Sequence, residues 1–411
     1  MQVSKERIQE MIETLAGFNT TPGNGVTRFS YTEEDTQARA YLTGLCEEIG
    51  LKVRVDAVGN VFARLEGADP SLPPVMSGSH IDSVKNGGRF DGIVGSVCAL
   101  EAVRVMAEEG IVPKHPVEAV FFAEEEGSSF KAPVVGSKVL VGKMTAADLK
   151  DALKGEDGRS AWDIIKAAGF EPENIEKDVL KKGDVKAMVE LHIEQSVRLD
   201  KEGHTIGVVE GIAGLNWFEV TLKGESNHAG ATPMHLRSDP MAAASQIIAE
   251  IKGMAAKAGP TTVATVGKLD IEPNIPNAIA AEVKFTVDIR DIYQSGIDSV
   301  AADLRAACEK YAAENNVTCQ ADCIATTVPI EVPKYLTDIL EDSAKELGLD
   351  YVLMPSGAVH DSNYMALITD IAMIFVPSIN GRSHVPEEDT SFDDIKAGAD
   401  LLLSALVKLS A

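Results

Sequence analysis

Histidines and carboxylates gather at four places in the 411-residue sequence. The first is the segment 78–92 (GSHIDSVKNGGRFDG), where His80 and Asp82 are two residues apart at the expected end of a strand and therefore point to the same face. A carboxylate behind an imidazole commonly orients it for metal binding. The glycines around Asp91 allow the chain to bend back, so that this carboxylate can approach His80. An ordinary turn with a capping aspartate explains the same residues equally well.

The second place is a run of three carboxylates, Glu124, Glu125 and Glu126, directly after the apolar strand predicted at 117–123. Three adjacent carboxylates at the end of a buried strand repel one another unless a positive charge compensates, and a divalent metal ion compensates well. Because neighbouring residues of an extended chain diverge, one carboxylate can bind a metal ion while the next faces a substrate. A solvated acidic loop is the alternative interpretation of this run.

The third and fourth places each contribute a histidine. Glu190, His192 and Glu194 alternate on one face of the strand predicted around 187–193, where a core strand would carry apolar residues. His384 ends the string SINGRSH, just after another apolar strand. A single buried histidine usually has a structural role, but a Glu-His-Glu face is difficult to explain by packing.

Together these residues predict a centre for two metal ions at the carboxyl edge of one sheet. The candidate ligands are His80, Asp91, one of Glu124–Glu126, His192 and His384. They offer nitrogen and oxygen atoms, no thiolate, and one carboxylate that could bridge the ions, which suits zinc or manganese. Two such ions can activate a shared water molecule for hydrolysis.

The elements that must position these residues alternate between strand and helix. In the first half we expect helices at 31–50 and 93–109, and strands at 52–58, 60–65, 74–77, 117–123 and 187–193. The alternation resumes after Pro329, with helices at 334–347 and after Asp393 and strands at 351–354 and 371–376. This pattern predicts an α/β fold, a mixed sheet with flanking helices.

A different pattern occupies the middle of the chain. Strands are expected at 217–223, 262–269, 282–290 and 317–324, and helices at 239–257 and 297–313. The order β-α-β-β-α-β is that of a ferredoxin-like split βαβ unit. We therefore predict a metal-binding catalytic domain made of residues 1–211 and 329–411, interrupted by a smaller α+β domain at 212–328.

Composition excludes several classes of protein. With 38 basic and 63 acidic residues the net charge is −25, which disfavours binding to nucleic acid or to an anionic membrane surface. A hydrophobic content of 45% argues against disorder, and no apolar run reaches the ~18 residues of a membrane span. Residues 1–17 are charged and amphipathic, unlike a signal peptide. Free thiols in a reducing cytoplasm are predicted by five scattered cysteines, Cys46, Cys98, Cys308, Cys319 and Cys323.

Motifs along nearly the whole chain resemble those of one enzyme family. The matching strings are GSHIDSVKNGGRFDGIVG, EEEGSSF, ELHIEQ, GVVEGIAG, NHAGATPM, PNAIAAEV, DIRD, SGAVHDSNYMA and SINGRSHVPEE. In combination they are similar to N-carbamoyl-L-amino-acid hydrolases, allantoate amidohydrolases and β-ureidopropionases, within the aminoacylase/carboxypeptidase-type superfamily of two-metal peptidases. The resemblance implies that the smaller ferredoxin-like domain is a lid and dimerisation domain.

The resemblance also implies how the metal ligands are shared. Asp91 would bridge the two ions. His80 and His192 would complete one metal site, and Glu126 and His384 would complete the other.

Three further residues match the family's catalytic positions. Glu125 would be the general base, which takes a proton from the bridging water and returns it to the leaving nitrogen. Asp82 would orient His80. His228 would reach across a homodimer into the neighbouring site and stabilise the oxyanion of the transition state.

The substrate-binding positions also follow from the resemblance. Asn277 and Arg290 would bind the substrate carboxylate, for which a planar guanidinium is well suited. An ordinary ion pair of Arg290 with Asp288 or Asp291 is the alternative. Other positions that would line the pocket are Gln195, Ser356, Gly357 and His360.

Some residues depart from the family's usual motifs, namely Ser129, Ser196, Val197, Leu215, Val359 and Arg382. The metal and base residues are all present, so the resemblance implies hydrolysis and leaves substrate choice open. We expect a cytoplasmic homodimer with two divalent ions per subunit, zinc or manganese, with cobalt and nickel as alternatives. It would cleave the carbamoyl C–N bond of an N-carbamoyl amino acid or a related ureido acid such as allantoate. A dipeptidase or N-acyl amino-acid deacylase is the main alternative, and a non-catalytic metal-dependent binding protein is a further one.

Overall fold

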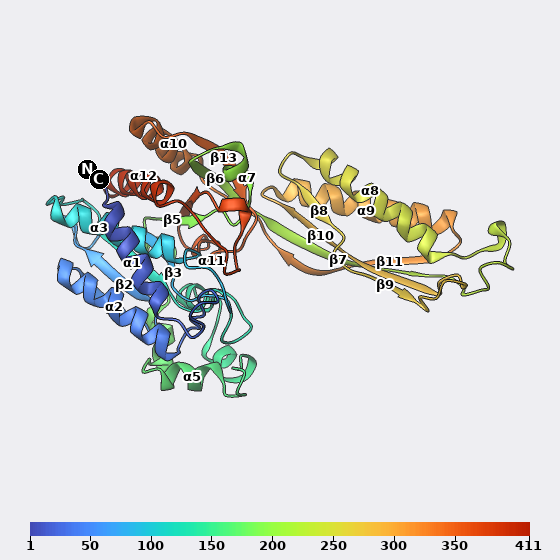
Figure 1. The fold of residues 1–411 in the computed structure, drawn as a ribbon, viewed down its shortest axis with the longest axis horizontal. Helices are drawn as coiled ribbons and strands as arrows, with labels where there is room; N and C mark the ends of the chain where they lie inside the picture. Colours follow the sequence, from blue (N-terminus) through green and yellow to red (C-terminus); the bar gives the residue numbers. More distant parts are fainter. The chain divides into compact units, whose positions relative to one another are not determined.

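The computed structural model describes all 411 residues, which form two compact units (Figure 1). Unit 1 comprises Met1–Glu210, Val332–Met354 and Val359–Ala411, and unit 2 comprises Gly211–Glu331 and Pro355–Ala358. The sequence places an insertion at 212–328, and it gives no indication of the short second segment of unit 2. None of the helices has both the length and the apolar character that crossing a membrane requires.

The larger sheet has nine strands in the order β1-β2-β4-β3-β5-β14-β6-β12, with β13 paired to β6, and all of them except β12 lie wholly or mostly in unit 1. Its strands are β1 (Lys52–Val55), β2 (Val61–Leu65), β3 (Val75–His80), β4 (Val117–Phe122), β5 (Ala187–Ile193), β6 (Ile206–Ile212), β12 (Ile330–Glu331), β13 (Tyr351–Ser356) and β14 (Asp370–Val376). The four neighbours β4, β3, β5 and β14 are parallel and buried along nearly their whole length. Residues at the carboxyl ends of these strands therefore meet at one edge of the sheet.

Helices pack around this sheet, which confirms the predicted α/β class. They are α1 (Lys5–Gly17), α2 (Glu33–Ile49), α3 (Ile93–Glu108), α4 (Val135–Leu140), α5 (Ala161–Ala167), α6 (Ile175–Asp178), α7 (Arg198–Glu202), α10 (Lys334–Leu347), α11 (Asp361–Met365) and α12 (Phe392–Ser410), with short turns at Asp148–Ala152, Pro172–Asn174 and Ile379–Gly381. Helix α3 is apolar on almost every side because it packs on β3, β4 and β5 and is itself covered by α1 and α12. Its first residue directly follows the turn that contains Asp91 and Gly92.

Unit 2 is a five-stranded antiparallel sheet in the order β11-β7-β10-β8, with β9 also paired to β10. Its strands are β7 (Gly214–Lys223), β8 (Val263–Thr265), β9 (Leu269–Glu272), β10 (Glu282–Asp291) and β11 (Thr318–Thr327), and its helices are α8 (Pro240–Ala258) and α9 (Gln294–Glu314), with a short turn at Met234–Leu236. Alternate residues of β10, from Val283 to Ile289, are buried in a core with both helices. The other face of the sheet carries no helix of unit 2.

The predicted order of elements in unit 2 differs from the structure at one point. The sequence predicts one strand at 262–269, whereas the structure has two short strands, β8 and β9, separated by residues 266–268. Gly267 lies in this break, and glycine is known to weaken strand interiors. Both short strands pair with β10, so the sheet remains continuous.

Candidate metal centre

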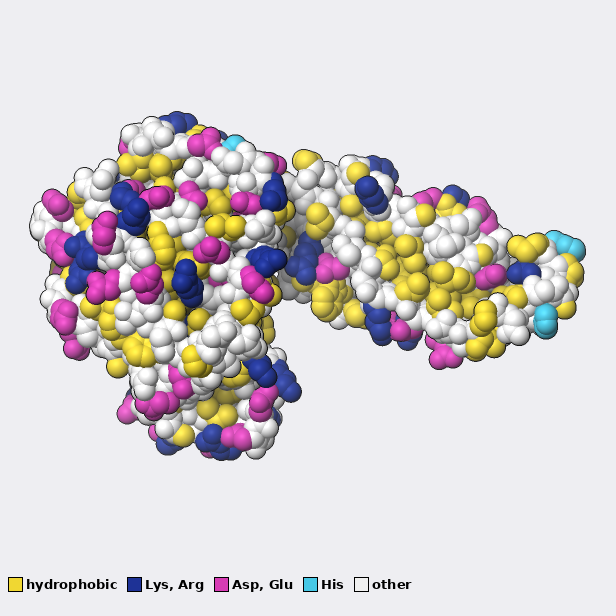
Figure 2. Space-filling model, viewed as in Figure 1, with side chains coloured by type: hydrophobic (Ala, Val, Ile, Leu, Met, Phe, Trp, Pro, Cys, Tyr) yellow, Lys and Arg dark blue, Asp and Glu magenta, His cyan; other side chains and the backbone are white.

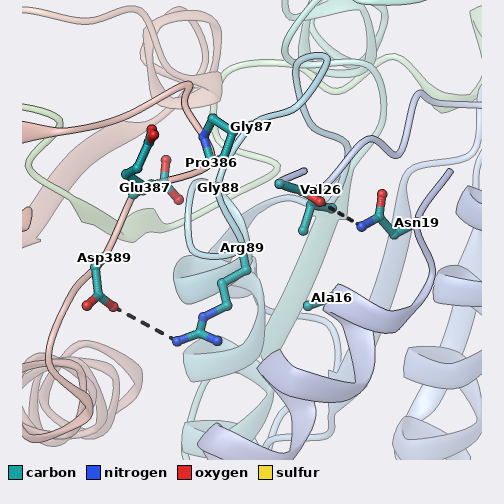
Figure 3. Close-up of a pocket in the computed structure, with 11 residues that line it drawn as sticks. Ala16, Asn19, Val26, Gly87, Gly88, Arg89, Pro386, Glu387 and Asp389 are labelled. Atoms are coloured by element: carbon teal, nitrogen blue, oxygen red, sulfur yellow. Dashed lines mark hydrogen bonds and ion pairs between the residues drawn. The ribbon is translucent and has the colours of Figure 1, made fainter. Parts of the chain in front are cut away.

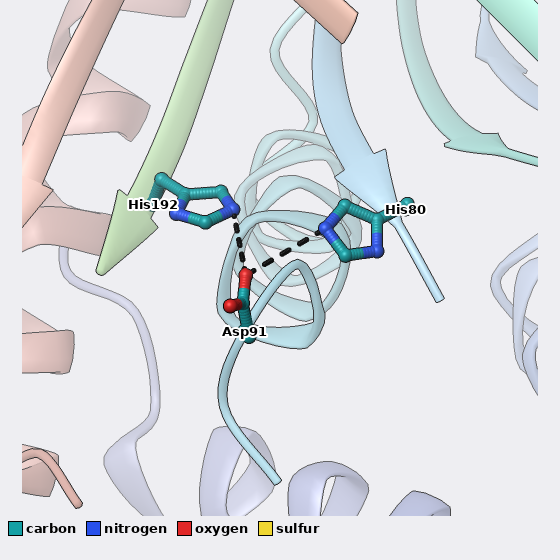
Figure 4. Close-up of side chains that lie close together, drawn as sticks. All are labelled: His80, Asp91 and His192. Carbon is teal, nitrogen blue, oxygen red and sulfur yellow. Dashed lines mark ion pairs between the residues drawn. The ribbon is translucent and has the colours of Figure 1, made fainter. Parts of the chain in front are cut away.

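Two histidines and an aspartate meet at the carboxyl edge of the unit 1 sheet (Figure 4). His80 ends β3 and His192 lies near the end of the adjacent parallel strand β5. The Asp91 atom Oδ1 lies 3.2 Å from His192 Nε2 and 3.7 Å from His80 Nε2. Gly92 makes this approach possible, because a Cβ atom at this position would overlap the His80 ring.

The second oxygen of Asp91 faces a different pair of residues. Asp91 Oδ2 lies 3.2 Å from His384 Nε2, which is 3.5 Å from Glu126 Oε2. Two groups able to hold a cation therefore share one carboxylate, and each group receives one of its oxygens. This is the arrangement that a carboxylate bridging two ions requires.

The backbone sets the orientation of the two strand histidines. His192 Nδ1 lies 2.9 Å from the carbonyl oxygen of Ile193, and His80 Nδ1 lies 3.1 Å from that of Asp82. Because a carbonyl only accepts hydrogen bonds, each Nδ1 carries a proton and donates it, and Nε2 is the ring nitrogen that faces Asp91. The Asp82 carboxylate is farther from His80, at 3.6 Å.

The carboxylates that follow β4 differ in their surroundings, and Asp82 holds the turn that carries them. Asp82 accepts hydrogen bonds from the backbone N–H groups of Glu125 and Glu126, both at 3.1 Å, and so fixes this turn. Glu124 has a positive φ of 53° and turns away to accept hydrogen bonds from Ser129 and Phe130. Glu125 Oε2 lies 3.7 Å from His80 Nε2. The run is largely buried, so the interpretation as a solvated acidic loop is wrong.

Electrostatics at this edge favour a bound cation. Burial raises the pKa of Glu125 well above its usual range although the neighbouring His80 lowers it, and burial together with Asp91 raises the pKa of Glu126 to about 7. The hydrogen bond to Asp91 raises the pKa of His384 to about 9. The ion-pair partners of these carboxylates are histidines only, with no lysine or arginine. A buried excess of carboxylates with nitrogen and oxygen donors on two sides fits divalent metal ions.

Two expected pocket residues border this centre. Gln195 donates from Nε2 to Asp91 Oδ2 at 2.8 Å. The buried ring of His360 packs edge-on against His192, with 4.6 Å between the ring centroids, and burial lowers the pKa of His360 well below its usual value. Glu190 also lies near these two histidines, but both of its oxygens already accept hydrogen bonds from serine hydroxyls, so it has a structural role.

The other expected site residues belong to unit 2. His228 is exposed, and its Nδ1 accepts hydrogen bonds from the backbone N–H groups of Gly230 and Ala231, at 3.0 and 3.2 Å. The proton of the neutral ring is therefore on Nε2, where it can be donated to a ligand. Asn277 lies beside this loop, since its carbonyl oxygen accepts from Ala229 at 2.9 Å.

Arg290 forms an ion pair with Asp288, which is the alternative role considered for it from the sequence. Its Nε and Nη2 atoms each donate to Asp288 at 3.0 Å, and Nη1 donates to the carbonyl oxygen of Gly357, also at 3.0 Å. A guanidinium has five N–H groups, so two remain for a further acceptor. Ser356, next to Gly357, is buried, and its carbonyl oxygen accepts from Ala213 at 2.8 Å.

The structure does not bring Asn277 and Arg290 together within unit 2. Residues 227–228 and 277–279 extend the β7–β10 pair beyond Lys223 and Glu282, whereas Arg290 pairs with Leu215 at the opposite end. At roughly 3.3 Å per residue, the eight steps from Glu282 to Arg290 cover about 26 Å. Figure 2 shows histidine side chains at one end of unit 2.

Two residues near Asp91 were not among those predicted from the sequence. Ser383 donates from Oγ to Asp91 Oδ2 at 2.7 Å, and Glu388 accepts the backbone N–H of Asp91 at 3.0 Å. The only signal for Glu388 was a second run of carboxylates, Glu387 to Asp389, which begins three residues after His384.

Comparison with known proteins identifies the family of this chain. The model of the peptidase family M20/M25/M40 matches residues 76–408. The N-carbamoyl-L-amino-acid amidohydrolase of Paenarthrobacter aurescens is 39% identical over 98% of each chain, and the allantoate amidohydrolase of Escherichia coli is 36% identical over 99% of this chain and 98% of its own. A crystal structure of an amidase of the hydantoinase/carbamoylase family from Burkholderia multivorans superimposes with a TM-score of 0.91, at 33% identity over 100% of this chain and 98% of that one. The chain therefore belongs to the peptidase family M20/M25/M40.

Proposed function

We propose that this protein is a metal-dependent amidohydrolase that cleaves the carbamoyl C–N bond of an N-carbamoyl amino acid or a related ureido acid such as allantoate. The observation that carries the proposal is the Asp91 carboxylate, whose two oxygens face two separate cation-binding groups. It occurs in a chain that is 36–39% identical, over nearly its full length, to amidohydrolases of such substrates.

The two groups are proposed to hold two divalent metal ions. His80 and His192 with Asp91 would hold one ion, and Glu126 and His384 with Asp91 the other. Zinc and manganese suit this set of donors best, and cobalt and nickel are alternatives. When bound, such ions supply Lewis-acid activation of a water molecule and of the scissile carbonyl.

Glu125 is proposed to act as the general base. Its carboxylate lies at the centre, 3.7 Å from His80, but neither of the two cation-binding groups includes it. It is therefore placed to accept a proton from the attacking water and to deliver one to the leaving nitrogen. The leaving ammonia and the carbamate, which decomposes to CO2 and the amine, complete the proposed reaction.

His228 is proposed to donate from Nε2 to the oxygen that becomes negative in the transition state. The hydrogen bonds of its Nδ1 keep the proton on Nε2. Within one chain, however, Arg290 lies about 26 Å from the His228 loop by strand length, whereas an N-carbamoyl amino acid spans only about 7 Å, the length of two residues. His228 and Asn277 would therefore act on a substrate that Arg290 of a second copy binds, which supports a homodimer.

The surroundings of Arg290 favour a particular class of substrate. A groove of about 500 Å³ beside Arg290 is lined by the exposed side chains of Trp217, Val263 and Ile324, on the sheet face that no helix of unit 2 covers. Asp288 holds Arg290 in place, which leaves two N–H groups for a substrate carboxylate. An apolar side chain fits this groove better than the polar ureido groups of allantoate, so N-carbamoyl derivatives of apolar amino acids are the preferred substrates.

A substrate panel tests the proposal. Metal-free protein would be loaded with zinc or manganese and offered N-carbamoyl-leucine, N-carbamoylglycine, allantoate, a dipeptide and an N-acetyl amino acid. We expect ammonia release from the ureido acids only. We also expect no turnover after chelation, with removal of the metal confirmed by elemental analysis. Release of an amino acid from the dipeptide or of acetate from the acetyl compound, without ammonia, would favour the dipeptidase or deacylase instead.

The cytoplasmic location stays a prediction from the cysteines, all five of which are free thiols in the structure.

A further inference from the structure

The loop after His384 carries a buried carboxylate that the proposed reaction does not use. Glu388 is only 5% exposed. Its Oε1 accepts hydrogen bonds from the backbone N–H groups of Phe90 and Asp91, both at 3.0 Å, and its Oε2 accepts one from the backbone N–H of His384 at 3.3 Å. One carboxylate thus connects the backbones of two candidate ligands that are far apart in the sequence.

His384 depends on such support more than the other candidate ligands do. His80 and His192 lie on buried strands, whereas His384 lies in a loop and its side chain is half exposed. Its φ of 60° is in the left-handed region, which is unfavourable for a non-glycine residue. Neighbouring groups must stabilise this conformation for it to persist. The hydrogen bond from its backbone to Glu388 is a direct contribution.

The two loops are shaped to admit the Glu388 side chain. Gly88 contacts it so closely that a Cβ atom at position 88 would overlap the carboxylate. Figure 3 shows Gly87 and Gly88 next to Pro386 and Glu387 of the facing loop, where both loops line a cavity of about 460 Å³. Glycine at position 88 is therefore required by a close approach.

We propose that Glu388 is a positioning residue that fixes the group Asp91, Glu126 and His384 in a cation-binding arrangement. It acts through the backbone and through the Ser383 hydroxyl, which lies 3.2 Å from its Oε2, and it offers no atom to the ion. The inference rests on the proposed metal centre. Asp91 has a second support, because the backbone N–H of Val94 at the start of α3 donates to the carbonyl of Phe90 at 2.9 Å. Loss of Glu388 should therefore weaken the group that contains His384 and largely spare the group that contains His80 and His192.

Titration of metal-free protein with zinc, followed by calorimetry, tests this selectivity. We expect two equivalents to bind to the unaltered protein. Glu388→Gln keeps the size of the side chain but leaves a single acceptor oxygen, so one equivalent should bind as before and the other about 10–100-fold more weakly. The matched control is Glu387→Gln, which alters the adjacent exposed carboxylate, 3.9 Å from Arg382, and should bind like the unaltered protein.

Each outcome decides a different point. Two equivalents bound with unaltered affinity by Glu388→Gln would overturn the inference and leave the metal centre intact. Fewer than two equivalents in the unaltered protein would overturn the metal centre and the inference with it. If Glu388→Gln does not fold, Gly88→Ala decides, because it keeps every carboxylate but forces Glu388 to move. The same selective loss is expected there, and unaltered binding would contradict the role of Glu388.

Discussion

The carboxylate of Asp91 determines how the two cation-binding groups are related. Burial alone would raise the pKa of Asp91, but hydrogen bonds with His192, His384 and His80 hold it well below its usual range. Gln195 also donates to Oδ2, the oxygen that faces His384. The carboxylate is therefore ionised and held from several sides, as a ligand shared by two cations must be.

The roles of Glu125 and Glu126 can be separated by removing one charge at a time. Glu125→Gln keeps the shape of the side chain but cannot accept a proton, so turnover should fall by ~10²–10⁴ while both metal ions stay bound. Glu126→Gln should lose metal as well as turnover, because Glu126 belongs to the group with His384. The measurements are metal content by elemental analysis and kcat on the best ureido substrate. Metal loss in the first variant and retention in the second would mean that the two roles are reversed.

Spacing alone predicts most of the centre, and backbone conformation explains the rest. His80 and His192 could be expected at one sheet edge because each follows or occupies a buried strand. Spacing does not show which of the three adjacent carboxylates faces the cations, because that depends on the positive φ at Glu124. The contribution of Glu388 was also hidden, because it acts on backbone N–H groups that no sequence pattern displays.

Among the elements, the unit 2 sheet shows how one residue pattern serves two purposes. Along β10 the inward residues form the core with α8 and α9, while the outward residues include Asp288 and Arg290. Alternation predicted this strand, but only the register of the sheet shows that Trp217 lies opposite Asp288 and that the groove beside Arg290 is apolar. The break between β8 and β9 was not predicted, since single glycines also occur within continuous strands.

The proposed use of the groove predicts a change in substrate preference. Trp217→Ala removes much of its apolar surface, so kcat/KM for N-carbamoyl-leucine should fall about tenfold, the lower end of the range for a buried leucine side chain, while N-carbamoylglycine changes little. Trp217→Phe is the matched control, because it keeps an aromatic surface in the groove. Equal losses on both substrates in Trp217→Ala would show that the groove does not hold the substrate side chain.

At the scale of the whole molecule, the residues that we propose for the site come from both units. The cation-binding groups belong to unit 1, and His228, Asn277 and Arg290 belong to unit 2. The chain passes between the units at four places, near Gly211, Glu331, Pro355 and Ala358, so a movement of one unit against the other would have its hinges there. The length of β10 further separates His228 from Arg290 within unit 2. One chain therefore cannot place both residues on one small substrate, which is why we propose that two chains share it.

Mixing two inactive variants tests whether two chains share a site. In a dimer of one Glu125→Gln and one His228→Ala subunit, the second subunit keeps Glu125 and receives an intact His228 from the first. Random pairing should restore roughly a quarter of the unaltered activity, since half the dimers are mixed and each has one complete site. As a control, Glu125→Gln mixed with Glu126→Gln should stay inactive, because both changes lie in the unit that holds the cation-binding groups. Mixed dimers would be isolated through two different affinity tags. If these purified dimers show no activity, His228 does not act across the dimer, and the 26 Å estimate from strand length would then exclude a joint action with Arg290 on one substrate.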